Sequence, residues 1–477
     1  MDYKQIGLKS GLEIHQQLDT GKLFCNCPSL LRKESPHFHI KRRLHPVAGE
    51  TGEVDIAVEY EASLNKEFIY QGYSDTTCLI ELDEEPPKNI NENALKEAIK
   101  IALLLNCEIY QATQIMRKTV IDGSNTSGFQ RTVILAHDGF IETSFGKVPI
   151  ETLMLEEDAA RIIEKNDKQS IYRLDRLGIP LIEIATAPVM NFPEQIKEAA
   201  LKIGEILRAC KVKRGIGTIR QDVNVSIKGH DKVEIKGFQD PSMMIKTIDL
   251  ELQRQSDELK KGKKTGEVRG ALPDGKTEFL RPSPGGARMY PETDLPLLKI
   301  SRELINEIKK ELPKLKTEIK EELKKKGLSE ELIPLVLDGN LDEFETLLKV
   351  YNKDANLVAK MITIWRSEIA SKIKKSLAEI KNTLTEAVLE TILEALIEGK
   401  ISESDIKPIM SKIIAGENIE KAIIVEKIDE NLLEEEIRKI IKEKPGLKPN
   451  AYMGLIMAKF KGKIDAKKAM EIINRSS

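Results

Sequence analysis

The feature that most constrains this chain is a change of sequence pattern near residue 296. Up to about residue 298, short β-type runs alternate with Gly and Pro, and beyond it Glu, Lys, Ile and Leu recur at helical spacing to about residue 473. A length of 477 residues suits about two to four domains. We therefore predict an α+β domain with a mixed or antiparallel sheet, followed by an all-helical region.

The expected elements follow from local signals. Strands are predicted at 56–60, 132–136, 180–185, 223–227 and 232–236, the last two joined as a hairpin by a Gly-containing loop. Helices are predicted at 93–105 and at 194–209, the second after a proline suited to a first helical turn. In the helical region, Gly327, Gly339, Gly399 and Gly416 mark stops. The predicted domains are 1–300, 301–412 and a small helical tail, 413–477.

Composition narrows the classes of protein. No run approaches the ~18 consecutive apolar residues of a membrane span, and the start of the chain has no targeting pattern, so a cytoplasmic protein is expected. Lys plus Arg, 75, nearly balance Asp plus Glu, 77, so any contact with nucleic acid must be local.

An acidic group is the first candidate site. Glu13 and His15 stand two apart in an extended segment, so both project from one face. Acids at 156–158, a run with Asp222 and Asn224 on one face, and Glu234 could join them to hold Mg²⁺, which prefers carboxylate oxygens. The alternative is that each carboxylate only solvates the surface.

Cysteines and a polar loop give two further candidates. Cys25 and Cys27 with Cys78 and a histidine at 37, 39 or 45 could bind zinc, although buried thiols are the favoured interpretation. The loop 121–131 is rich in small hydrogen-bond donors and has basic residues at 117, 118 and 131 beside it, so it could hold phosphate, or be a plain turn. No standard phosphate-binding loop and no nucleophile elbow occur.

Seven segments together resemble a known family: GLEIHQQL at 11–18, KLFCNC at 22–27, DTTCLIELDEEPP at 75–87, IDGSNTSGFQRT at 121–132, LEEDA at 155–159, RLGIPLIE at 176–183 and ARMYPETD at 287–294. The chain resembles the GatB/GatE family of glutamyl-tRNA(Gln) amidotransferase subunits, in its archaeal GatE branch, over nearly its whole length. The resemblance implies a cradle-shaped catalytic domain, a helical domain and a tail similar to YqeY proteins. One departure stands out, because a short loop near 260–268 replaces the aspartyl-tRNA-synthetase-like insert of GatE proteins.

The resemblance also implies an activity: ATP-dependent phosphorylation of the glutamate on Glu-tRNA(Gln), followed by amidation with ammonia. The implied Mg²⁺ ligands are Glu13, His15, Glu157 and Glu234, with Asp222 and Asn224 as second choices. The implied contacts to ATP phosphates are Lys118, Ser124, Asn125, Arg220 and Lys236. Arg288 and Tyr290 are expected near the glutamyl end of the tRNA.

The implied partners are an asparaginase-like glutaminase, the GatD protein, in a heteromer of two copies each, and tRNA(Gln) charged with glutamate. In the tail, tRNA contacts are expected from Lys444, Lys448, Lys459, Lys461 and Lys463. Two rival hypotheses remain: a non-catalytic tRNA-binding module, and a zinc-dependent hydrolase built around Cys25 and Cys27.

Overall fold

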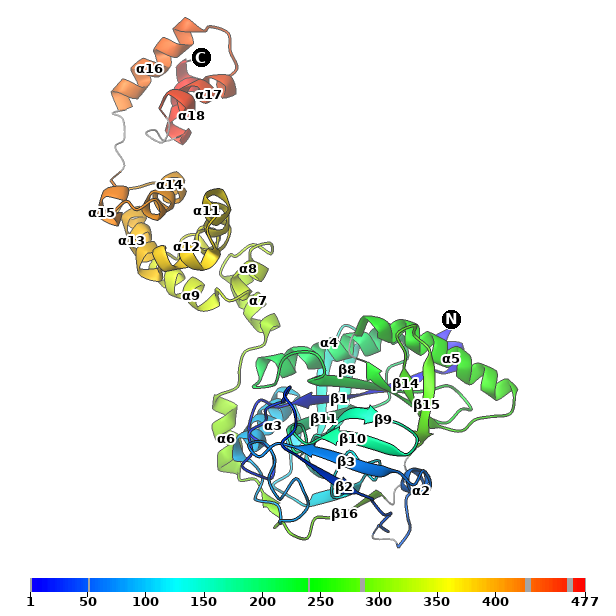
Figure 1. The fold of residues 1–477 in the computed structure, drawn as a ribbon. Helices are drawn as coiled ribbons and strands as arrows, with labels where there is room; N and C mark the ends of the chain where they lie inside the picture. The colour runs from blue at the N-terminus through cyan, green and yellow to red at the C-terminus, as the bar shows by residue number, and fades with distance from the viewer. Residues whose placement is uncertain are drawn as a thin grey trace. The chain divides into compact units, whose positions relative to one another are not determined.

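The computed structural model describes residues 2–49, 52–238, 241–283, 288–424, 430–460 and 466–476 (Figure 1). The chain divides into two compact units, Met1–Leu315 and Lys316–Ser477. The first is α+β and the second is helical in its described residues, so the predicted fold class is confirmed.

One large sheet dominates the first unit. Within the described residues its strand order is β15-β14-β13-β12-β1-β11-β8-β7-β6-β16, with β4 added beside β7. Its pairings in this part of the chain are antiparallel except that of β13 with β14. Its strands are β1 (Lys9–Gln17), β4 (Glu108–Ile109), β6 (Ile115–Thr119), β7 (Phe129–Thr143), β8 (Gly146–Glu157), β11 (Pro180–Thr186), β12 (Ile219–Ser226), β13 (Val233–Phe238), β14 (Glu267–Ala271), β15 (Thr277–Pro282) and β16 (Met289–Pro291).

In the described residues, two smaller sheets and six α-helices complete the unit. The four-stranded sheet has the order β2-β3-β10-β9, and β17 pairs with β5. These strands are β2 (Phe38–Arg42), β3 (Glu67–Gly72), β5 (Ala112–Thr113), β9 (Arg161–Lys165), β10 (Gln169–Arg173) and β17 (Leu298–Lys299). The described helices are α1 (Tyr3–Ile6), α2 (Ile56–Ser63), α3 (Glu92–Leu104), α4 (Pro193–Ala209), α5 (Met244–Lys260) and α6 (Arg302–Lys310).

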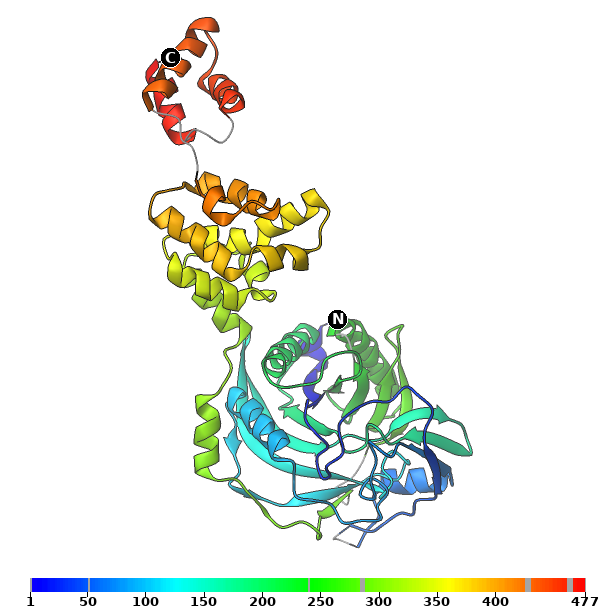
Figure 2. The ribbon, with the colours of Figure 1, turned by 60° about the vertical axis from the view of Figure 1, so that its left-hand side comes forward.

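Helices α3, α4 and α5 cover one face of the large sheet (Figure 2). Leu12 and Ile14 of β1 point to that side and join Ile196 and Ile203 of α4 in one buried cluster. Because side chains alternate along a strand, the residues between them face away from the helices. This layer therefore fixes which side chains of β1 remain free for a site.

The predicted elements are mostly confirmed. The hairpin forms as β12 and β13, paired antiparallel, and the helices at 93–105 and 194–209 appear as α3 and α4. Residues 261–266 alone connect α5 to β14. This is the place where a short loop was expected instead of the aspartyl-tRNA-synthetase-like insert.

The strand predicted at 56–60 is wrong, because these residues form the start of α2. Asp55 caps this helix by accepting a hydrogen bond from the Ala57 amide. Ala57 and Val58 are its buried residues. A five-residue run is too short for its pattern to separate strand from helix, and the Asp55 cap favours the helix.

The described residues of the second unit form two separate buried clusters. The larger runs from Leu323 to Ala422, and the smaller, in α16–α18, runs from Leu433 to Ile473. The described helices are α7 (Lys316–Lys325), α8 (Ile333–Leu337), α9 (Leu341–Val350), α10 (Ala355–Lys360), a π-helical turn (Met361–Trp365), α11 (Arg366–Ile373), α12 (Leu377–Thr383), α13 (Glu386–Ile397), α14 (Glu403–Ile414), α15 (Ile419–Ala422), α16 (Glu430–Glu443), α17 (Pro449–Lys459) and α18 (Ala466–Ser476). None of the described helices has the length and apolar character needed to cross a membrane.

Candidate active site

A polar cavity of about 510 Å³ opens on the face of the large sheet away from α4. Almost every strand in the middle of the sheet contributes a charged side chain to it. Its charged lining residues are Glu13, His15, Lys118, Glu156, Asp158, Glu183, Arg220, Asp222, Lys232, Glu234, Lys236, Arg281 and Arg288. Acids and bases are thus interleaved over one surface.

Strand register brings the acids together. Glu13 of β1 lies opposite Asp222 of β12, and His15 lies opposite Glu183 of β11. Directly opposed residues in antiparallel strands point to the same face. Four side chains from three strands therefore meet at one place, although up to 209 positions separate them along the chain.

His15 lies at the centre of this acidic group. Its Nε2 lies 3.4 Å from Glu13 Oε1, 3.3 Å from Glu183 Oε2 and 4.0 Å from Glu156 Oε1. Burial would lower the pKa of His15, but the hydrogen bond and charge of Glu183 outweigh it and raise that pKa to about 9. Burial, together with the charge of Glu183, raises the pKa of Glu13 to about 7.

Two lysines balance the acids. Lys118 Nζ lies 2.9 Å from Glu156 Oε2 and 3.4 Å from Glu183 Oε2. Burial alone would lower the pKa of Lys118, yet these two carboxylates raise it. Burial would likewise raise the pKa of Glu183, but Lys118 and His15 hold it well below its usual range.

Lys236 occupies the corresponding place on the other side of the cavity. Its Nζ lies 2.8 Å from Asp222 Oδ2 and 2.5 Å from Glu234 Oε1. Burial alone would lower the pKa of Lys236, but Asp222 and Glu234 raise it. Both lysines thus carry a positive charge in the cavity.

The acidic group fits a divalent cation. Glu13, His15 and Asp222 form one set, and His15, Glu156 and Glu183 another, whose potential ligand atoms all lie within 4.8 Å of one another. His15 Nδ1 and Asn224 Oδ1 are buried and have no hydrogen-bond partner in the described part of the chain. Carboxylates suit Mg²⁺ and Mn²⁺, whereas the imidazole suits softer ions such as Zn²⁺ or Fe²⁺.

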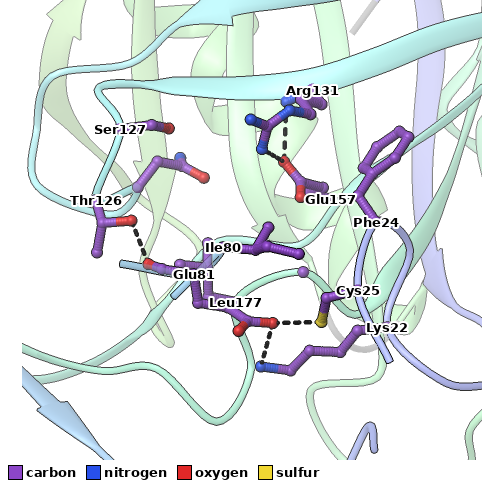
Figure 3. Close-up of a pocket in the computed structure, with 12 residues that line it drawn as sticks. Lys22, Phe24, Cys25, Ile80, Glu81, Thr126, Ser127, Arg131, Glu157 and Leu177 are labelled. Carbon is purple, nitrogen blue, oxygen red and sulfur yellow. Dashed lines mark hydrogen bonds and ion pairs between the residues drawn. The ribbon is translucent and has the colours of Figure 1, made fainter. Parts of the chain in front are cut away.

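Glu157 does not join this group. It is the neighbour of Glu156 on β8 and points to the other side of the strand, where its Oε2 lies 3.5 Å from Arg131 Nη1 (Figure 3). It lines a separate small pocket, and burial raises its pKa against the opposing charge of Arg131. Glu156 takes the place in the cavity that the sequence assigned to Glu157, because neighbours on a strand face opposite sides.

The predicted phosphate contacts are divided between sites. Lys118, Arg220 and Lys236 line the cavity. Asn125 lines the small pocket with Glu157, and Ser124 donates to Asp122 Oδ1 at 2.6 Å. The polar loop 121–131 makes hydrogen bonds within itself and also to other segments, since the Tyr70 hydroxyl donates to the Gly123 carbonyl.

The two residues expected at the glutamyl end are also separated. Arg288 lines the cavity and donates to the Thr119 carbonyl at 3.1 Å. The Tyr290 ring packs on Phe129 and lies 5.9 Å from the Arg117 guanidinium. Among these two, Arg288 alone lines the cavity.

Three cavity acids were given no role from the sequence: Glu183, and Glu156 and Asp158 of the acidic run 156–158. Glu183 is a single carboxylate within the apolar run 180–185, a placement that costs free energy without partners and could have signalled a site. Glu156 was noted only as part of the acidic run 156–158. The face to which the Glu156 side chain points depends on the pairing of β8 with β7 and β11. This pairing cannot be derived from the local sequence.

Comparison with known proteins finds a family model that covers most of the α+β unit. The family model of the GatB/GatE catalytic domain matches residues 8–306, which include all the cavity residues named above.

Similarity extends beyond that domain. The E subunit of glutamyl-tRNA(Gln) amidotransferase from Methanocaldococcus jannaschii is 37% identical, over 100% of this chain and 99% of the relative. The protein of the same name from Pyrobaculum neutrophilum is 33% identical, over 99% of each. The chain belongs to the GatB/GatE family. The first alignment runs over 631 residues, whereas this chain has 477, so the relative carries segments that have no counterpart here.

Proposed function

We propose that this chain is the kinase and transamidase subunit of a glutamyl-tRNA(Gln) amidotransferase. It transfers the γ-phosphoryl group of ATP to the side-chain carboxylate of glutamate esterified to tRNA(Gln), and ammonia then displaces phosphate to give Gln-tRNA(Gln). The names of its relatives support the substrate, and the charged cavity on the sheet supports the chemistry.

The observation that carries this proposal is the interleaving of acids and bases on one face. Phosphoryl transfer needs positioning and neutralisation of negative charge more than a nucleophilic side chain. Lys118, Lys236, Arg220 and Arg288 supply positive charge within the same cavity as the acids.

In this scheme the basic residues orient the phosphates and the glutamate carboxylate. Arg220 is held by Asp158, whose Oδ1 lies 2.9 Å from Arg220 Nη2. Asp158 is itself buried and also accepts from Gln17 at 2.6 Å. A guanidinium fixed in this way presents its remaining donors in a constant direction, which favours recognition of an anionic group.

The acids would hold a divalent cation, Mg²⁺ by preference. Glu13, His15, Glu183, Asp222 and Glu156 offer its ligand atoms, and Glu234 is a further carboxylate in the cavity. When bound, the cation supplies neutralisation of the charge that develops on the transferred phosphoryl group.

The ammonia would come from a partner. We propose an asparaginase-like glutaminase in a heteromer of two copies each, with the cytoplasm as its compartment. The helical unit and its tail would bind the tRNA, in part through Lys444 and Lys448, which are exposed, and Lys459, which pairs with Glu436. Lys461 and Lys463 lie outside the described residues.

A reconstituted assay tests the proposal. The chain and its glutaminase partner are incubated with Glu-tRNA(Gln), ATP, Mg²⁺ and glutamine, and Gln-tRNA(Gln) and ADP are measured. We expect both products, each dependent on the charged tRNA. ATP cleavage that does not depend on the charged tRNA, or no ATP cleavage at all, would contradict the assignment.

The alternative, a non-catalytic tRNA-binding module, differs from the proposal in its prediction for ADP formation and not in its prediction for tRNA affinity. Such a module would bind tRNA equally well with or without the cavity acids. We expect Glu183→Gln to abolish ADP formation and to leave the affinity for tRNA unchanged. A wild-type chain that binds tRNA but forms no ADP with its partner present would favour the alternative.

A further inference from the structure

A second, smaller cavity adjoins the charged cavity of the first unit. Its polar lining residues are Glu61 of α2, Thr119 and Asp122 at the end of β6 and in the loop after it, Arg281 of β15, and Arg288. We call it the side pocket. Arg281 and Arg288 also line the large cavity, so the two cavities share this wall. The side pocket has a volume of about 50 Å³, enough for a small polar group, since a single water needs about 10 to 15 Å³ of such space.

Helix α2 brings Glu61 to the side pocket. The helix packs on β15, where the rings of Tyr60 and Phe279 meet edge to face with their centroids 6.3 Å apart (Figure 1). This contact holds α2 beside the strand that carries Arg281. Glu61 is partly buried, and burial raises the pKa of its carboxyl, with the charge of Asp122 acting in the same direction. A cation bound between these two acids would relieve both effects.

Asp122 and Thr119 offer two further oxygen atoms. Asp122 Oδ1 accepts from the Ser124 amide at 2.9 Å and from the Ser124 hydroxyl at 2.6 Å. These bonds orient the carboxylate, and in the described part of the chain Oδ2 accepts no hydrogen bond. Thr119 is buried, and its Oγ1 has no hydrogen-bond partner among the described residues. A buried hydroxyl without a partner costs free energy, so a ligand group is expected to meet it.

The wall that the two cavities share is positively charged. Within the described residues, neither the Arg281 nor the Arg288 guanidinium forms an ion pair. Burial, and then the charge of Arg281, hold the pKa of Arg288 below its usual range. Two guanidinium groups close enough to repel each other are stabilised by an anion, and a carboxylate can accept two parallel hydrogen bonds from one of them. The shared wall therefore suits a carboxylate.

We propose that Glu61 and Asp122 bind the α-ammonium group of the glutamyl residue on the tRNA, while Arg281 and Arg288 hold its γ-carboxylate at the edge of the large cavity. This inference rests on the proposed function and names how that site recognises its amino acid. Esterification removes the charge of the α-carboxyl group, so a glutamyl ester carries one ammonium and one carboxylate. Two acids on one side and two bases on the shared wall complement this pair of charges.

The same charges separate the amino acid from ATP. Loop 121–131 was considered from the sequence as a holder of phosphate, yet it presents Asp122 to the side pocket. A second carboxylate, Glu61, lines the same pocket, and two acids disfavour a phosphate by repulsion. Lys118, Arg220 and Lys236 line the large cavity and not the side pocket. The nucleotide phosphates therefore belong in the large cavity, with the γ-carboxylate meeting them at the shared wall.

A substrate without the ammonium group tests this on the unaltered chain. The chain, its glutaminase partner, ATP, Mg²⁺ and glutamine are given tRNA(Gln) esterified either with glutamate or with 2-hydroxyglutarate, which carries a hydroxyl of similar size in place of the ammonium. We expect kcat/KM for ADP formation to be about 10- to 100-fold lower with 2-hydroxyglutarate, because a hydrogen bond to a charged group contributes about that much. No variant has to fold for this measurement.

Matched variants then place the contact. Glu61→Gln and Asp122→Asn should each lower kcat/KM for Glu-tRNA(Gln) by about 10- to 100-fold. With the 2-hydroxyglutarate substrate the same variants should have little effect, because the group that they bind is already absent. Comparing variant and substrate in this way isolates the pairwise contact from general damage to the chain. Glu59→Gln, at an exposed position of the same helix, is the control and should change neither rate.

Two results would overturn the inference and leave the proposed function intact. One is an equal kcat/KM for the two substrates in the unaltered chain. The other is a loss in Glu61→Gln and Asp122→Asn that is as large with 2-hydroxyglutarate as with glutamate. In both cases Gln-tRNA(Gln) would still form. An unaltered chain that forms no ADP with Glu-tRNA(Gln) would instead contradict the proposed function, and this inference with it.

Discussion

At the scale of single residues, strand alternation separates two adjacent glutamates. Glu156 faces the cavity and pairs with Lys118, whereas Glu157 faces the small pocket and pairs with Arg131. Both are glutamates and are adjacent on β8. The same substitution, Glu to Gln, can therefore compare their roles directly.

We expect Glu156→Gln to reduce ATP-dependent formation of Gln-tRNA(Gln) by at least about 10- to 100-fold, because loss of an outer partner of a metal ligand already costs that much. Glu157→Gln should affect the rate much less and lower the free energy of unfolding by about 1 to 3 kcal/mol, because it removes a charged partner of Arg131. Arg131 keeps Glu292, 2.8 Å away. The rate of Gln-tRNA(Gln) formation and the urea unfolding of both variants check this. A larger loss of rate in Glu157→Gln than in Glu156→Gln would restore Glu157 as the metal ligand.

The raised pKa values of Glu13 and His15 predict that metal binding releases protons. Below pH 7 the Glu13 carboxyl is protonated, and below pH 9 the His15 imidazole is protonated. A cation that uses both groups must displace about two protons near pH 6 and about one near pH 8, so its affinity should rise with pH.

Calorimetry with Mn²⁺ in buffers of different ionisation enthalpy measures this release. Glu13→Gln should lower the release near pH 6 to about one proton and leave the value near pH 8 unchanged. Proton release that does not vary between pH 6 and pH 8 would show that Glu13 is not a ligand.

At the scale of elements, the long periodic patterns and most of the short runs predicted the structure, and the run at 56–60 did not. The helices at 93–105 and 194–209 carry several turns of amphipathic pattern, and both appear almost at the predicted bounds. The run at 56–60 is too short for its pattern to separate a strand from a helix, and in the structure it begins a helix that Asp55 caps.

In the helical unit, a buried ion pair joins separate elements. Arg366 of α11 is buried and makes two hydrogen bonds to Glu343 of α9, at 2.7 and 2.6 Å, and a further one to the Leu384 carbonyl. Glu343→Gln would leave the guanidinium buried beside a neutral group. We expect a loss of about 3 to 5 kcal/mol in the free energy of unfolding of this unit.

The single tryptophan of the chain, Trp365, is the neighbour of Arg366 and packs on the same core, so its fluorescence reports urea unfolding of this unit. Glu368→Gln is the matched control, because Glu368 pairs with Lys407 on the surface, where an ion pair contributes about 0 to 1 kcal/mol. Equal shifts in both variants would contradict a special role for the buried pair.

At the scale of the whole molecule, the core of the helical unit determines where the tail can be removed. The larger cluster includes Ile413 and Ala422, so a chain ending at residue 412 would lose part of that core. A chain ending at residue 424 keeps the cluster and removes α16–α18, which have their own core. The domain boundaries at 300 and 412 stay predictions, although the compact units divide near residue 315.

We expect the chain that ends at residue 424 to bind tRNA(Gln) more weakly and to keep its affinity for ATP. For each phosphate that the shortened chain no longer neutralises, the log–log slope of tRNA affinity against salt concentration should become shallower by about 0.7 to 0.9. Titrations at several salt concentrations measure this, with Lys444→Gln as a milder variant that keeps the tail. An unchanged affinity and slope would assign tRNA binding to other parts of the chain.

The sequence by itself determined the order of an α+β unit and a helical unit, the hairpin, the long helices and the family, because these depend on local periodicity and on contiguous motifs. Only the tertiary structure decided which acids meet. Glu183 lies beside His15, Glu157 points to the opposite side of its strand, and Glu81 contacts cysteines from a distant segment. Strand register and loop packing set these distances, and neither can be derived from a short segment of the sequence.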